Sequence, residues 1–449
     1  MVSSQSAISP RAVDGLQRKR IGLLTPYSGG NFGDAAIQDA VIMNLRQRIP
    51  DAQIIGITFD PADTGQRHGI RSYPIDASSY PVSANIDSDV TDGPPAREVS
   101  KRQQSPVVRL GQRVLQRALA TLRGWGREGR HIADTVRVLR ELDLLIVSGG
   151  GQLDEFWGGP WAHPYNLFKW VTLARLLKRP VAVASVGACV LNTRLSRWFV
   201  RHALRLTAYR SYRDPRSRAI VSTLGPDTDG AVVPDLAFSF PTDNYINQPR
   251  SAHRRPVLLA CPIIFAKPGV WPEPDQESYE GYIHRLAAFL NRAIEMGFAV
   301  HFVGSTHVDH SVIDDVLTTM STHGKPVESR DISTFRCETL PDFLREVENS
   351  DFVVASRLHA ILLSHLLEKP VLAISYDPKV DVHMKQIGQQ RYCVAIRDFD
   401  AAVLEQKFVE LVERRGFIVD GLRTNLRNYK NTLAAQYDNI VRLVQYEVR

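Results

Sequence analysis

Short apolar runs that end in polar loops and then pass into helical segments recur along most of this chain, and this alternation restricts the fold more than any other feature. Strands that are joined through helices form parallel sheets with helices packed on their faces. The sequence therefore predicts an α/β protein of the doubly wound kind. The expected strands are Arg20–Leu24, Gln53–Thr58, Leu144–Val147, Val181–Ser185 and Ala208–Tyr212 in the first half, and Val257–Cys261, Ala299–Val303, Phe352–Ala355 and Val371–Ser375 in the second.

The alternation restarts after a segment rich in Asn, Pro and Arg, Asp243–Pro256, which we interpret as a linker. At 449 residues the chain is too long for one ordinary domain. We expect two Rossmann-like domains, at residues 20–245 and 255–420, facing each other across a cleft. A disordered lead-in is expected at 1–19 and a helix that packs back at 421–449. Ligands of such sheets lie outside the carboxyl ends of the strands, so both halves should direct those ends into the cleft.

The composition is that of a globular protein, with 44% hydrophobic and 23% charged residues. No apolar run approaches the roughly 20 residues that span a bilayer. The first residues lack the apolar core of a secretory signal. The four cysteines stand far apart without paired spacing, which argues against a disulfide framework or a structural zinc site. We therefore expect a cytoplasmic protein.

The alternation is expected to stop at about residues 61–130, in a basic insert. The segment Lys101–Arg130 holds eight Lys or Arg against Glu128 alone, a surplus of +7 that equals the net charge of the whole chain. Apolar residues recur there at helical spacing, with arginines on another stripe, which predicts an amphipathic basic helix. Such a helix is either a solvated insert or a peripheral contact with the inner face of a membrane through 101–130.

The stretch Asp351–Lys379 contains the strongest candidate site. Between a buried strand and an apolar helix stand Ser356, Arg357, Leu358 and His359. Free backbone N–H groups and the positive end of the helix dipole favour anions at such a junction. Because Arg357 and His359 can both face the cleft, we interpret them as an anion site. A buried histidine bonded to a carbonyl group is the structural alternative.

Three further polar groups follow expected strands, and each has a structural alternative. In Gly30-Asn31-Phe32-Gly33-Asp34, Asp34 can cap the next helix, and a capped turn is favoured over a ligand loop. Gly149-Gly150-Gly151 either offers amides that cradle an anion or forms a tight turn. Arg213 either holds a ligand anion or is a surface side chain paired with Asp214.

Several other kinds of site are not indicated. His307 and His310 have no evident third metal ligand, and His365 is assigned to packing. No dinucleotide fingerprint, phosphate-binding loop or nucleophile elbow occurs in the expected context. Aromatic and basic residues form no array suited to nucleic acid. We expect no metal and no nucleic-acid partner.

Six motifs, taken in order, resemble the polysaccharide pyruvyl transferase family. The resemblance runs from about Ile21 to Ile396. Two departures are visible: Ala35 stands where the family usually has an acidic residue, and the insert at 61–130 has no equivalent. The motifs are Gly30-Asn31-Phe32-Gly33-Asp34, Gly149-Gly150-Gly151, Arg213-Asp214, Pro234-Asp235-Leu236-Ala237-Phe238, Ser356-Arg357-Leu358-His359-Ala360 and Tyr376-Asp377-Pro378-Lys379.

The resemblance implies a fold similar to the glycosyltransferase B type, with phosphoenolpyruvate as donor substrate and no cofactor. The acceptor would be a sugar or a lipid-linked glycan of a surface polysaccharide such as an exopolysaccharide. The product would be a pyruvate ketal bridging two hydroxyls, with phosphate released. The family's donor-binding residues fall on Arg213, Arg357 and His359.

The residue types suit this chemistry, because arginine binds carboxylate or phosphate in a bidentate way. His359, poised near neutral pH, would protonate the methylene carbon, and such assistance is typically worth about 10²–10⁴-fold. Asp377 and Lys379 either touch the ligand or only fix their loop. The remaining expected substrate-binding residues are Leu358, Gly149, Gly150, Asn31, Asp34 and Lys379.

Two alternatives remain open. A glycosyltransferase that uses a nucleotide sugar would share the architecture, although no nucleotide motif is evident. A membrane-associated scaffold would use 101–130 for docking and leave the cleft without activity.

Overall fold

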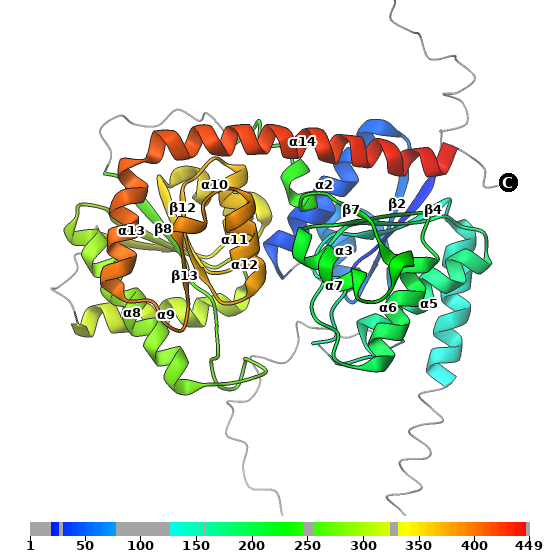
Figure 1. The fold of residues 1–449 in the computed structure, drawn as a ribbon, viewed down its shortest axis with the longest axis horizontal. Coiled ribbons are helices and arrows are strands. Elements are labelled where there is room, and N and C mark those ends of the chain that lie inside the picture. The colour runs from blue at the N-terminus through cyan, green and yellow to red at the C-terminus, as the bar shows by residue number, and fades with distance from the viewer. Residues whose placement is uncertain are drawn as a thin grey trace, which may run out of the picture.

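The computed structural model describes residues 19–26, 30–77, 126–156, 158–245, 255–323 and 331–445. The expected lead-in up to residue 18 and residues 101–125 of the basic segment lie outside this part. Two lobes, each built on one parallel sheet, lie side by side (Figure 1). The α/β fold class predicted from the alternation is confirmed.

The first lobe contains the described residues between 19 and 245. Its sheet has the strand order β3-β2-β1-β4-β5-β6-β7, and every pairing is parallel. Residues 126–141 are also helical. The strands are β1 (Arg20–Leu24), β2 (Gln53–Thr58), β3 (Arg71–Pro74), β4 (Leu144–Ser148), β5 (Val181–Val186), β6 (Tyr209–Tyr212) and β7 (Ala231–Val232), and the named helices are α2 (Phe32–Arg48), α3 (Pro61–His68), α5 (His163–Leu176), α6 (Arg194–Arg205), α7 (Pro215–Ser222), η1 (Pro226–Thr228) and η2 (Leu236–Ser239).

The second lobe contains the described residues between 255 and 413. Its sheet has the order β10-β9-β8-β11-β12-β13, again parallel throughout. The strands are β8 (Val257–Cys261), β9 (Ala299–Val303), β10 (Ile332–Phe335), β11 (Phe352–Ala355), β12 (Val371–Ser375) and β13 (Cys393–Ala395), and the helices are α8 (Gln276–Glu295), η3 (His307–Asp309), α9 (His310–His323), α10 (Leu340–Asn349), α11 (Leu358–Leu366), α12 (Pro378–Gln386), η4 (Gln390–Tyr392) and α13 (Ala401–Glu413).

The expectation that the alternation stops at residue 61 was wrong. Helix α3 and strand β3 continue it as far as Pro74. Asp60 caps α3 by accepting a hydrogen bond from the Asp63 amide, and β3 lies at the edge of the sheet beside β2. An edge strand that ends in proline carries little apolar signal, which explains why the sequence did not indicate it.

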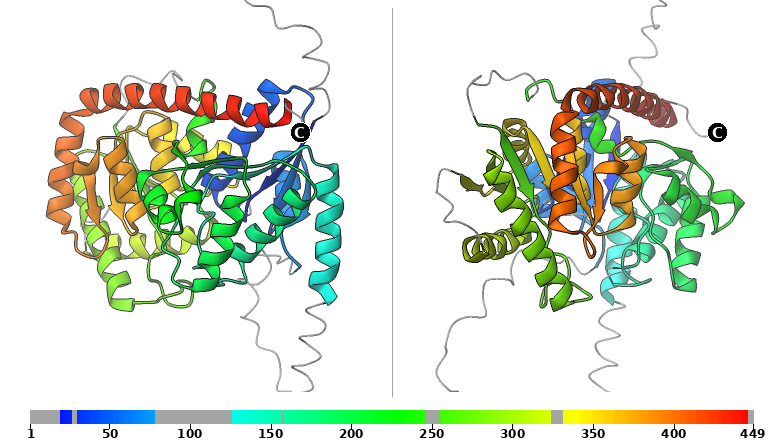
Figure 2. Two further views of the ribbon diagram at one scale, coloured as in Figure 1. Left: turned by 45° about the vertical axis from the view of Figure 1, so that its right-hand side comes forward. Right: turned by 60° about the vertical axis from the view of Figure 1, so that its left-hand side comes forward.

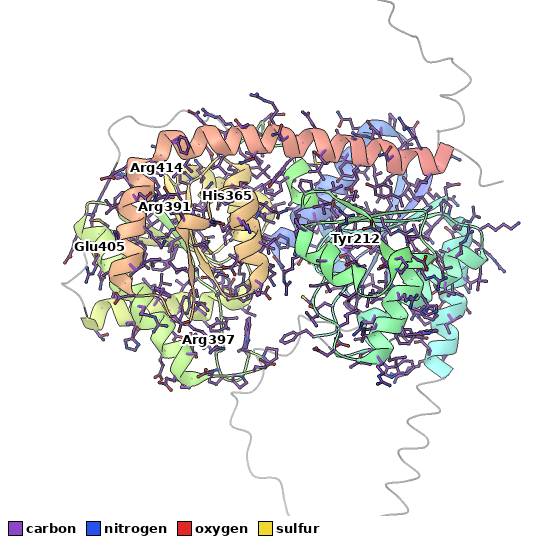
Figure 3. All side chains as sticks on the ribbon, in the orientation of Figure 1. Tyr212, His365, Arg391, Arg397, Glu405 and Arg414 are labelled. Atoms are coloured by element: carbon purple, nitrogen blue, oxygen red, sulfur yellow. The ribbon has the colours of Figure 1, made fainter. Side chains whose placement is uncertain are left out.

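The lobes share one hydrophobic core. Side chains of α2 and η2 belong to the same buried cluster as those of α10 and α11. At the joint, the rings of Phe32 and Phe343 lie 5.9 Å apart. Asn31 also forms an isolated antiparallel bridge with Thr306, across the two lobes. Figure 3 shows the side chains of both lobes, with Tyr212 in the first lobe and His365 in the second.

Helix α14 (Arg415–Gln445) runs across both lobes (Figures 1 and 2). Leu422 and Leu426 are buried at its start, and Leu433 and Tyr437 further along. Gln436 of α14 is buried against the first lobe. Its carboxamide accepts hydrogen bonds from Ser211 and Tyr209 and donates one to Ser185 Oγ. The helix is therefore tied to the first sheet by a polar anchor as well as by apolar contacts.

Gln436→Leu keeps the volume of this anchor but leaves the buried hydroxyls without their partner. Because an unsatisfied buried polar group costs about 1–3 kcal/mol, we expect the thermal unfolding midpoint to fall by a few degrees. Asn428→Ala, at an exposed position of the same helix, is the matched control and should shift stability by no more than about 0.5 kcal/mol. Equal midpoints for Gln436→Leu and wild type would show that the anchor contributes nothing.

Candidate functional site

Most of the predicted site residues come from the points where the strand order of each sheet reverses, whereas Arg213 follows β6 and Lys379 follows β12. In the first sheet the chain turns outward from β1 and returns to β4, and in the second it turns outward from β8 and returns to β11. Ligands of open α/β sheets bind at such switch points. The loop after β1 carries Asn31, the loop after β4 carries Gly149, and the loop after β11 carries Arg357. The two switch points face each other across the joint.

Helix α2 is capped by Asn31 and not, as expected, by Asp34. The Asn31 side chain accepts a hydrogen bond from the Gly33 amide at 3.0 Å. Asp34 lies inside the first turn and is buried. The capping role thus falls to a neighbouring residue, and the Asp34 carboxyl is left for another role.

Gly33 is a point of close approach between the lobes. A Cβ atom placed on Gly33 would lie 2.0 Å from His359 Cγ and 2.1 Å from His359 Cβ. Real atoms do not come this close, so only glycine allows the His359 side chain to rest on the start of α2. The sequence analysis placed this glycine in a loop but did not predict that His359 packs against it.

Arg357 is held by a buried carboxylate. Its Nε and Nη2 donate to Asp309 Oδ2 and Oδ1 at 2.7 and 2.8 Å, a bidentate pair. Asp309 is fully buried and also accepts a hydrogen bond from Thr306 Oγ1. Two of the three guanidinium nitrogens of Arg357 are therefore committed to fixing its loop against the loop after β9.

Arg213 has looser partners. Its Nε lies 3.4 Å from Asp214 Oδ2 and its Nη1 lies 3.3 Å from Asp235 Oδ2, both near the long limit for a hydrogen bond. Its side chain is 11% exposed, so it is not the surface arginine of the structural alternative, although the predicted contact with Asp214 is present. Nη2 rests against Gly187, where a Cβ would lie 2.7 Å away.

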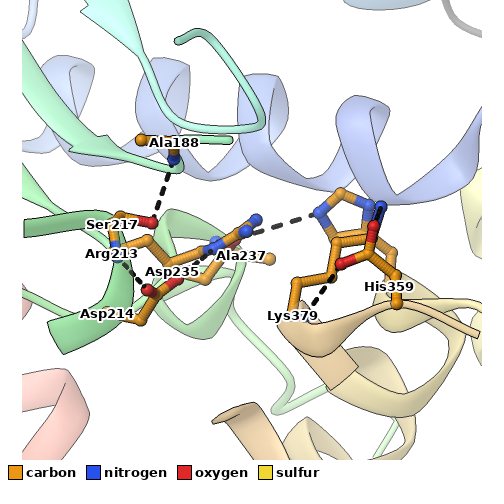
Figure 4. A network of polar contacts seen from close by, with 9 residues as sticks. Ala188, Arg213, Asp214, Ser217, Asp235, Ala237, His359 and Lys379 are labelled. Atoms are coloured by element: carbon orange, nitrogen blue, oxygen red, sulfur yellow. Dashed lines mark hydrogen bonds and ion pairs between the residues drawn. The ribbon is translucent and has the colours of Figure 1, made fainter. Parts of the chain in front are cut away.

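Asp235 joins the two lobes electrostatically. Its Oδ2 lies 3.9 Å from His359 Nε2 and also faces Arg213, while Oδ1 accepts the amide of Ala237 and caps η2 (Figure 4). His359 Nε2 is buried and has no hydrogen-bond partner within the described residues. The arrangement leaves a histidine nitrogen aimed at a buried carboxylate but not bonded to it.

Lys379 and Leu358 complete the ring around these groups. Lys379 lies in the first turn of α12, with its ammonium 3.7 Å from Asp377 Oδ2 and 4.9 Å from the centre of the Tyr376 ring. Asp377 caps α12 by accepting the Lys379 amide. Leu358 is buried at the first turn of α11. Arg213, Asp235, Leu358 and Lys379 all line one cavity of about 20 Å³, which holds about one water molecule.

The glycines after β4 form a tight turn, which was one of their two predicted roles, and the Gly149 amide is occupied within it. The Gly149 amide donates to the Ala184 carbonyl at 2.9 Å, and the Gly150 carbonyl accepts the Gly187 amide at 2.7 Å. Both glycines have positive φ, 55° and 66°. A Cβ on Gly149 would lie 2.8 Å from Ile37 Cγ2, so this tight turn lets α2 pack closely. The predicted turn is the arrangement present.

Burial moves the pKa of Asp34 and that of His359 in opposite directions. For Asp34, burial and the charge of Asp235 raise the pKa to about 8, against the lowering effect of Arg213. For His359, burial outweighs the charge of Asp235 and lowers the pKa to about 4. The expectation of a histidine poised near neutral pH was therefore wrong for the free protein. At pH 7 Asp34 carries a proton and His359 is neutral.

Sequence reasoning did not assign a role to Asp235 or Asp309. Asp235 stood within a quoted motif and follows β7, and Asp309 follows β9. A carboxylate near the end of a strand was a signal for both. The prediction that His365 serves packing agrees with its full burial, and its Nδ1 lies 2.9 Å from His383 Nε2.

Within the described residues, no group of three or more His, Cys, Asp or Glu is arranged to hold a metal ion. The same part of the chain contains no helix that is long and apolar enough to cross a membrane. What the residues can do is bind an anion with Arg213 and Lys379 and exchange protons through Asp34 and His359.

A family model described as polysaccharide pyruvyl transferase matches residues 31–378. This range contains every predicted site residue except Lys379. No curated protein matches the chain.

Solved structures with the same fold include enzymes that act on nucleotide sugars. A protein from Listeria monocytogenes assigned as a UDP-N-acetylglucosamine 2-epimerase is 9% identical, with a TM-score of 0.59 over 93% of this chain and 94% of that one. The UDP-GlcNAc 2-epimerase from Neisseria meningitidis, bound to UDP-GlcNAc, is 13% identical, with a TM-score of 0.52 over 95% and 99%. A glycosyltransferase from Rickettsia africae is 10% identical, with a TM-score of 0.51 over 95% and 99%. The fold is similar to the glycosyltransferase B type.

Gly33→Ala should disturb the joint between the lobes. The added methyl group would overlap the His359 side chain near its backbone, where the ring cannot swing away freely. Overpacking of this kind costs about 1–3 kcal/mol, so we expect a lower thermal midpoint. Gly30→Ala is the control, because a Cβ there meets no atom within 4 Å. If both variants unfold at the wild-type temperature, the close approach does not constrain the protein.

Asp34 should make the protein less stable as pH rises. The folded state keeps its proton up to about pH 8, whereas the unfolded chain releases it near the ordinary value of 3.8. Between these values the folded state binds more protons, so its stability falls with pH, by at most about 1.4 kcal/mol per unit. Asp34→Asn removes this dependence. Thermal midpoints of the two proteins, measured from about pH 5 to pH 8, should therefore diverge in favour of the variant. Parallel curves would show that Asp34 is ionised in the folded protein.

Proposed function

Because the chain belongs to the polysaccharide pyruvyl transferase family, we propose that it transfers the enolpyruvyl carbons of phosphoenolpyruvate to two hydroxyls of one sugar. The sugar belongs to a surface polysaccharide or its precursor, the product is a pyruvate ketal, and phosphate is released. We further propose that the enzyme acts in the cytoplasm, since all four cysteines are unpaired.

The observation that carries this proposal is the convergence of cations with His359 where the two switch points meet. Arg213 comes from the first lobe, and Arg357 and Lys379 come from the second. Phosphoenolpyruvate has a carboxylate and a phosphate, each of which an arginine can bind in a bidentate way. A donor with two anionic groups suits a site whose cations lie on facing lobes.

The hydrogen-bond partners of each cationic side chain determine which side chain can bind the donor directly. Among the described residues, the Arg213 guanidinium has only the two long contacts with Asp214 and Asp235, so a phosphate or carboxylate can replace them at little cost. Arg357 is committed to Asp309, and only Nη1 is left to reach the donor. We therefore assign the main anion contacts to Arg213 and Lys379, and the fixing of the loop to Arg357.

The reaction balances without a cofactor. A proton adds to the methylene carbon of phosphoenolpyruvate, which makes the neighbouring carbon electrophilic, and the first sugar hydroxyl adds to that carbon. The bond between this carbon and the phosphate oxygen then breaks, and the second hydroxyl adds to the same carbon to close the ketal ring. Of the two hydroxyl protons, one replaces the proton used on the methylene carbon and the other leaves with phosphate. No metal or redox partner enters this scheme.

His359 is the proposed proton donor. Its pKa is lowered to about 4 by burial in the free protein. The negative charges of bound phosphoenolpyruvate favour the protonated imidazole, because an opposite charge within about 4–6 Å raises the pKa of a histidine. Asp34, which already holds a proton at neutral pH, is a second group that can supply one.

The donor needs more room than the free protein offers. The cavity at Arg213 and Lys379 measures about 20 Å³, whereas small-molecule sites usually occupy about 300–1,000 Å³. Binding therefore separates groups that are in contact here, and the 3.9 Å approach of His359 to Asp235 lies in the path.

A nucleotide-sugar glycosyltransferase is the second candidate, favoured by the fold shared with the Rickettsia africae glycosyltransferase. Calorimetric titration with UDP- and GDP-sugars distinguishes the two. Tight binding of a nucleotide sugar, without phosphate release from phosphoenolpyruvate, would favour this second activity.

The test of the main proposal is release of inorganic phosphate from phosphoenolpyruvate in the presence of glycan acceptors. We expect His359→Ala and His359→Gln to lower turnover by at least about a hundredfold, which is the low end for loss of acid catalysis. His284→Ala, at an exposed position on α8, is the matched control and should retain wild-type turnover. Near-wild-type turnover in both His359 variants would remove this histidine from the chemistry.

Asp34→Asn distinguishes, in the same assay, whether His359 or Asp34 donates the proton. With His359 as donor, this variant should lose less than about tenfold in turnover. A larger loss than that of His359→Ala would transfer the role of proton donor to Asp34. Absence of phosphate release with every sugar acceptor would contradict the proposed function itself.

A further inference from the structure

The chain contains a second basic stretch that net charge does not show. Between Phe156 and Arg213 it has ten Lys or Arg and no Asp or Glu. The positive charge of segment 101–130 already equals the net charge of the whole chain. The stretch between Phe156 and Arg213 is therefore noticeable only because it lacks acidic residues. It includes α5, α6 and the loops that lead to them from β4 and β5.

Aromatic rings on α5 and α6 form one continuous group that reaches the surface. Trp161 lies 5.5 Å from Tyr165 and 5.6 Å from Phe199, measured between ring centres, and Trp198 lies 5.0 Å from Phe168 and 5.4 Å from Phe199. The inner rings are covered, but Trp161 is 67% exposed and Trp198 is 46% exposed. Leu176, Val190 and Phe156 are also exposed on the same helices and loops.

Arginines surround the exposed tryptophan of α6. Arg194 and Arg197 are exposed and make no ion pair within the described residues, whereas Arg205 pairs with Asp227. In sequence they stand four and one residues before Trp198, on the first turns of α6. We call the outer faces of α5 and α6, with Trp161, Trp198, Arg194 and Arg197, the aromatic–basic surface.

This surface begins where the candidate site ends. Gly187, which rests against Arg213, is followed by the loop that carries Val190 and leads into α6. The turn at Gly149 and Gly150 is followed by the loop that carries Phe156 and Trp161. Figures 1 and 2 show α14 along one side of the molecule, with α5 and α6 away from it. A partner on this surface would therefore contact helices whose leading loops begin beside the candidate site.

The chemistry of the surface favours one kind of partner. A second copy of the chain in a symmetric contact would bring the unpaired arginines of both copies into one interface without acidic partners from this stretch, and like charges at an interface repel. Tryptophan prefers the boundary between hydrocarbon and lipid headgroups, and arginine binds headgroup phosphates. An amphipathic helix with arginines around a tryptophan has the composition of a segment that lies in that boundary.

We propose that the aromatic–basic surface docks the protein on an anionic lipid bilayer, with Trp161 and Trp198 at the headgroup boundary and Arg194 and Arg197 on the headgroup phosphates. Given the proposed function, docking presents the site to an acceptor anchored in the same bilayer. This surface differs from the membrane contact predicted at 101–130, of which residues 101–125 lie outside the described part. The described end of that segment belongs to helix 126–141, where Glu128 accepts hydrogen bonds from Tyr165 and Lys169 of α5.

Co-sedimentation of the full chain with vesicles tests the proposal. We expect binding to vesicles of phosphatidylcholine with phosphatidylglycerol, weak binding to phosphatidylcholine alone, and a loss of binding as salt increases. The double variant Arg194→Glu, Arg197→Glu should lower the partition coefficient at least about tenfold, and Trp161→Ser should lower it about fivefold or more. Both changes are at exposed positions, so thermal midpoints should stay near wild type.

The control has the same change of charge at another place. Arg336→Glu with Arg427→Glu reverses two exposed arginines, one in the second lobe and one on α14, and should bind vesicles as wild type does. An equal loss in this control would assign binding to total charge and overturn the proposal. So would wild-type protein that stays in the supernatant, wild-type binding by both surface variants, or a dimer in solution that Trp161→Ser abolishes.

Phosphate release separates this proposal from the proposed function. With a water-soluble acceptor, Arg194→Glu, Arg197→Glu should turn over like wild type, because neither arginine belongs to the site. With an acceptor embedded in anionic vesicles, the same variant should lose activity in proportion to its lost binding. Equal activity on both acceptors would overturn the docking role while leaving pyruvyl transfer intact.

Discussion

The contact between Gly33 and His359 is the interaction on which the rest of the site depends. Two helices, α2 and α11, begin at the switch points of two separate sheets, and they meet at this contact. The absence of a side chain on Gly33 lets the imidazole ring settle onto the first turn of α2. That position brings His359 within 3.9 Å of Asp235 and places both beside Arg213. A larger residue at position 33 would overlap the His359 side chain and disturb the groups that this joint brings together.

The charges around the joint are nearly balanced, and this balance shapes what the site can bind. Three cations, Arg213, Arg357 and Lys379, face carboxylates that hold them with different strength. The short bidentate pair between Arg357 and Asp309 is structural, whereas a ligand anion can replace the long contacts of Arg213. Asp34 avoids adding another negative charge by keeping its proton, because burial and Asp235 raise its pKa to about 8. An incoming anion thus meets a cation whose present partners are weak and a carboxyl group that does not repel it.

Hydrophobic periodicity predicts the interior strands of the fold, whereas packing between distant parts of the chain determines the remaining features. The interior strands were predicted from their apolar runs. Strands β3, β7, β10 and β13 were not, and all four are edges of their sheets, where one side lacks a neighbour and the apolar run is short. The candidate site residues were proposed because polar groups at strand ends are visible in a sequence. The partner of Arg357 was not predicted, since its pairing with Asp309 joins residues 48 positions apart. Asn31, and not Asp34, caps α2, and no local pattern distinguishes the two. The pKa of His359 follows from burial under the other lobe, which the sequence does not reveal.

Helix α14 has a mechanical consequence for any opening of the joint. It is one unbroken helix of 31 residues, on the order of 46 Å long, and it is buried against the second lobe at Leu422 and against the first at Tyr437 and Gln436. A stiff rod fixed at both ends prevents the lobes from sliding apart along its length, so they can separate only by rotation about an axis close to the rod. Displacement then grows with distance from α14. The widest gap between the lobes therefore opens on the side of the molecule that lies away from α14.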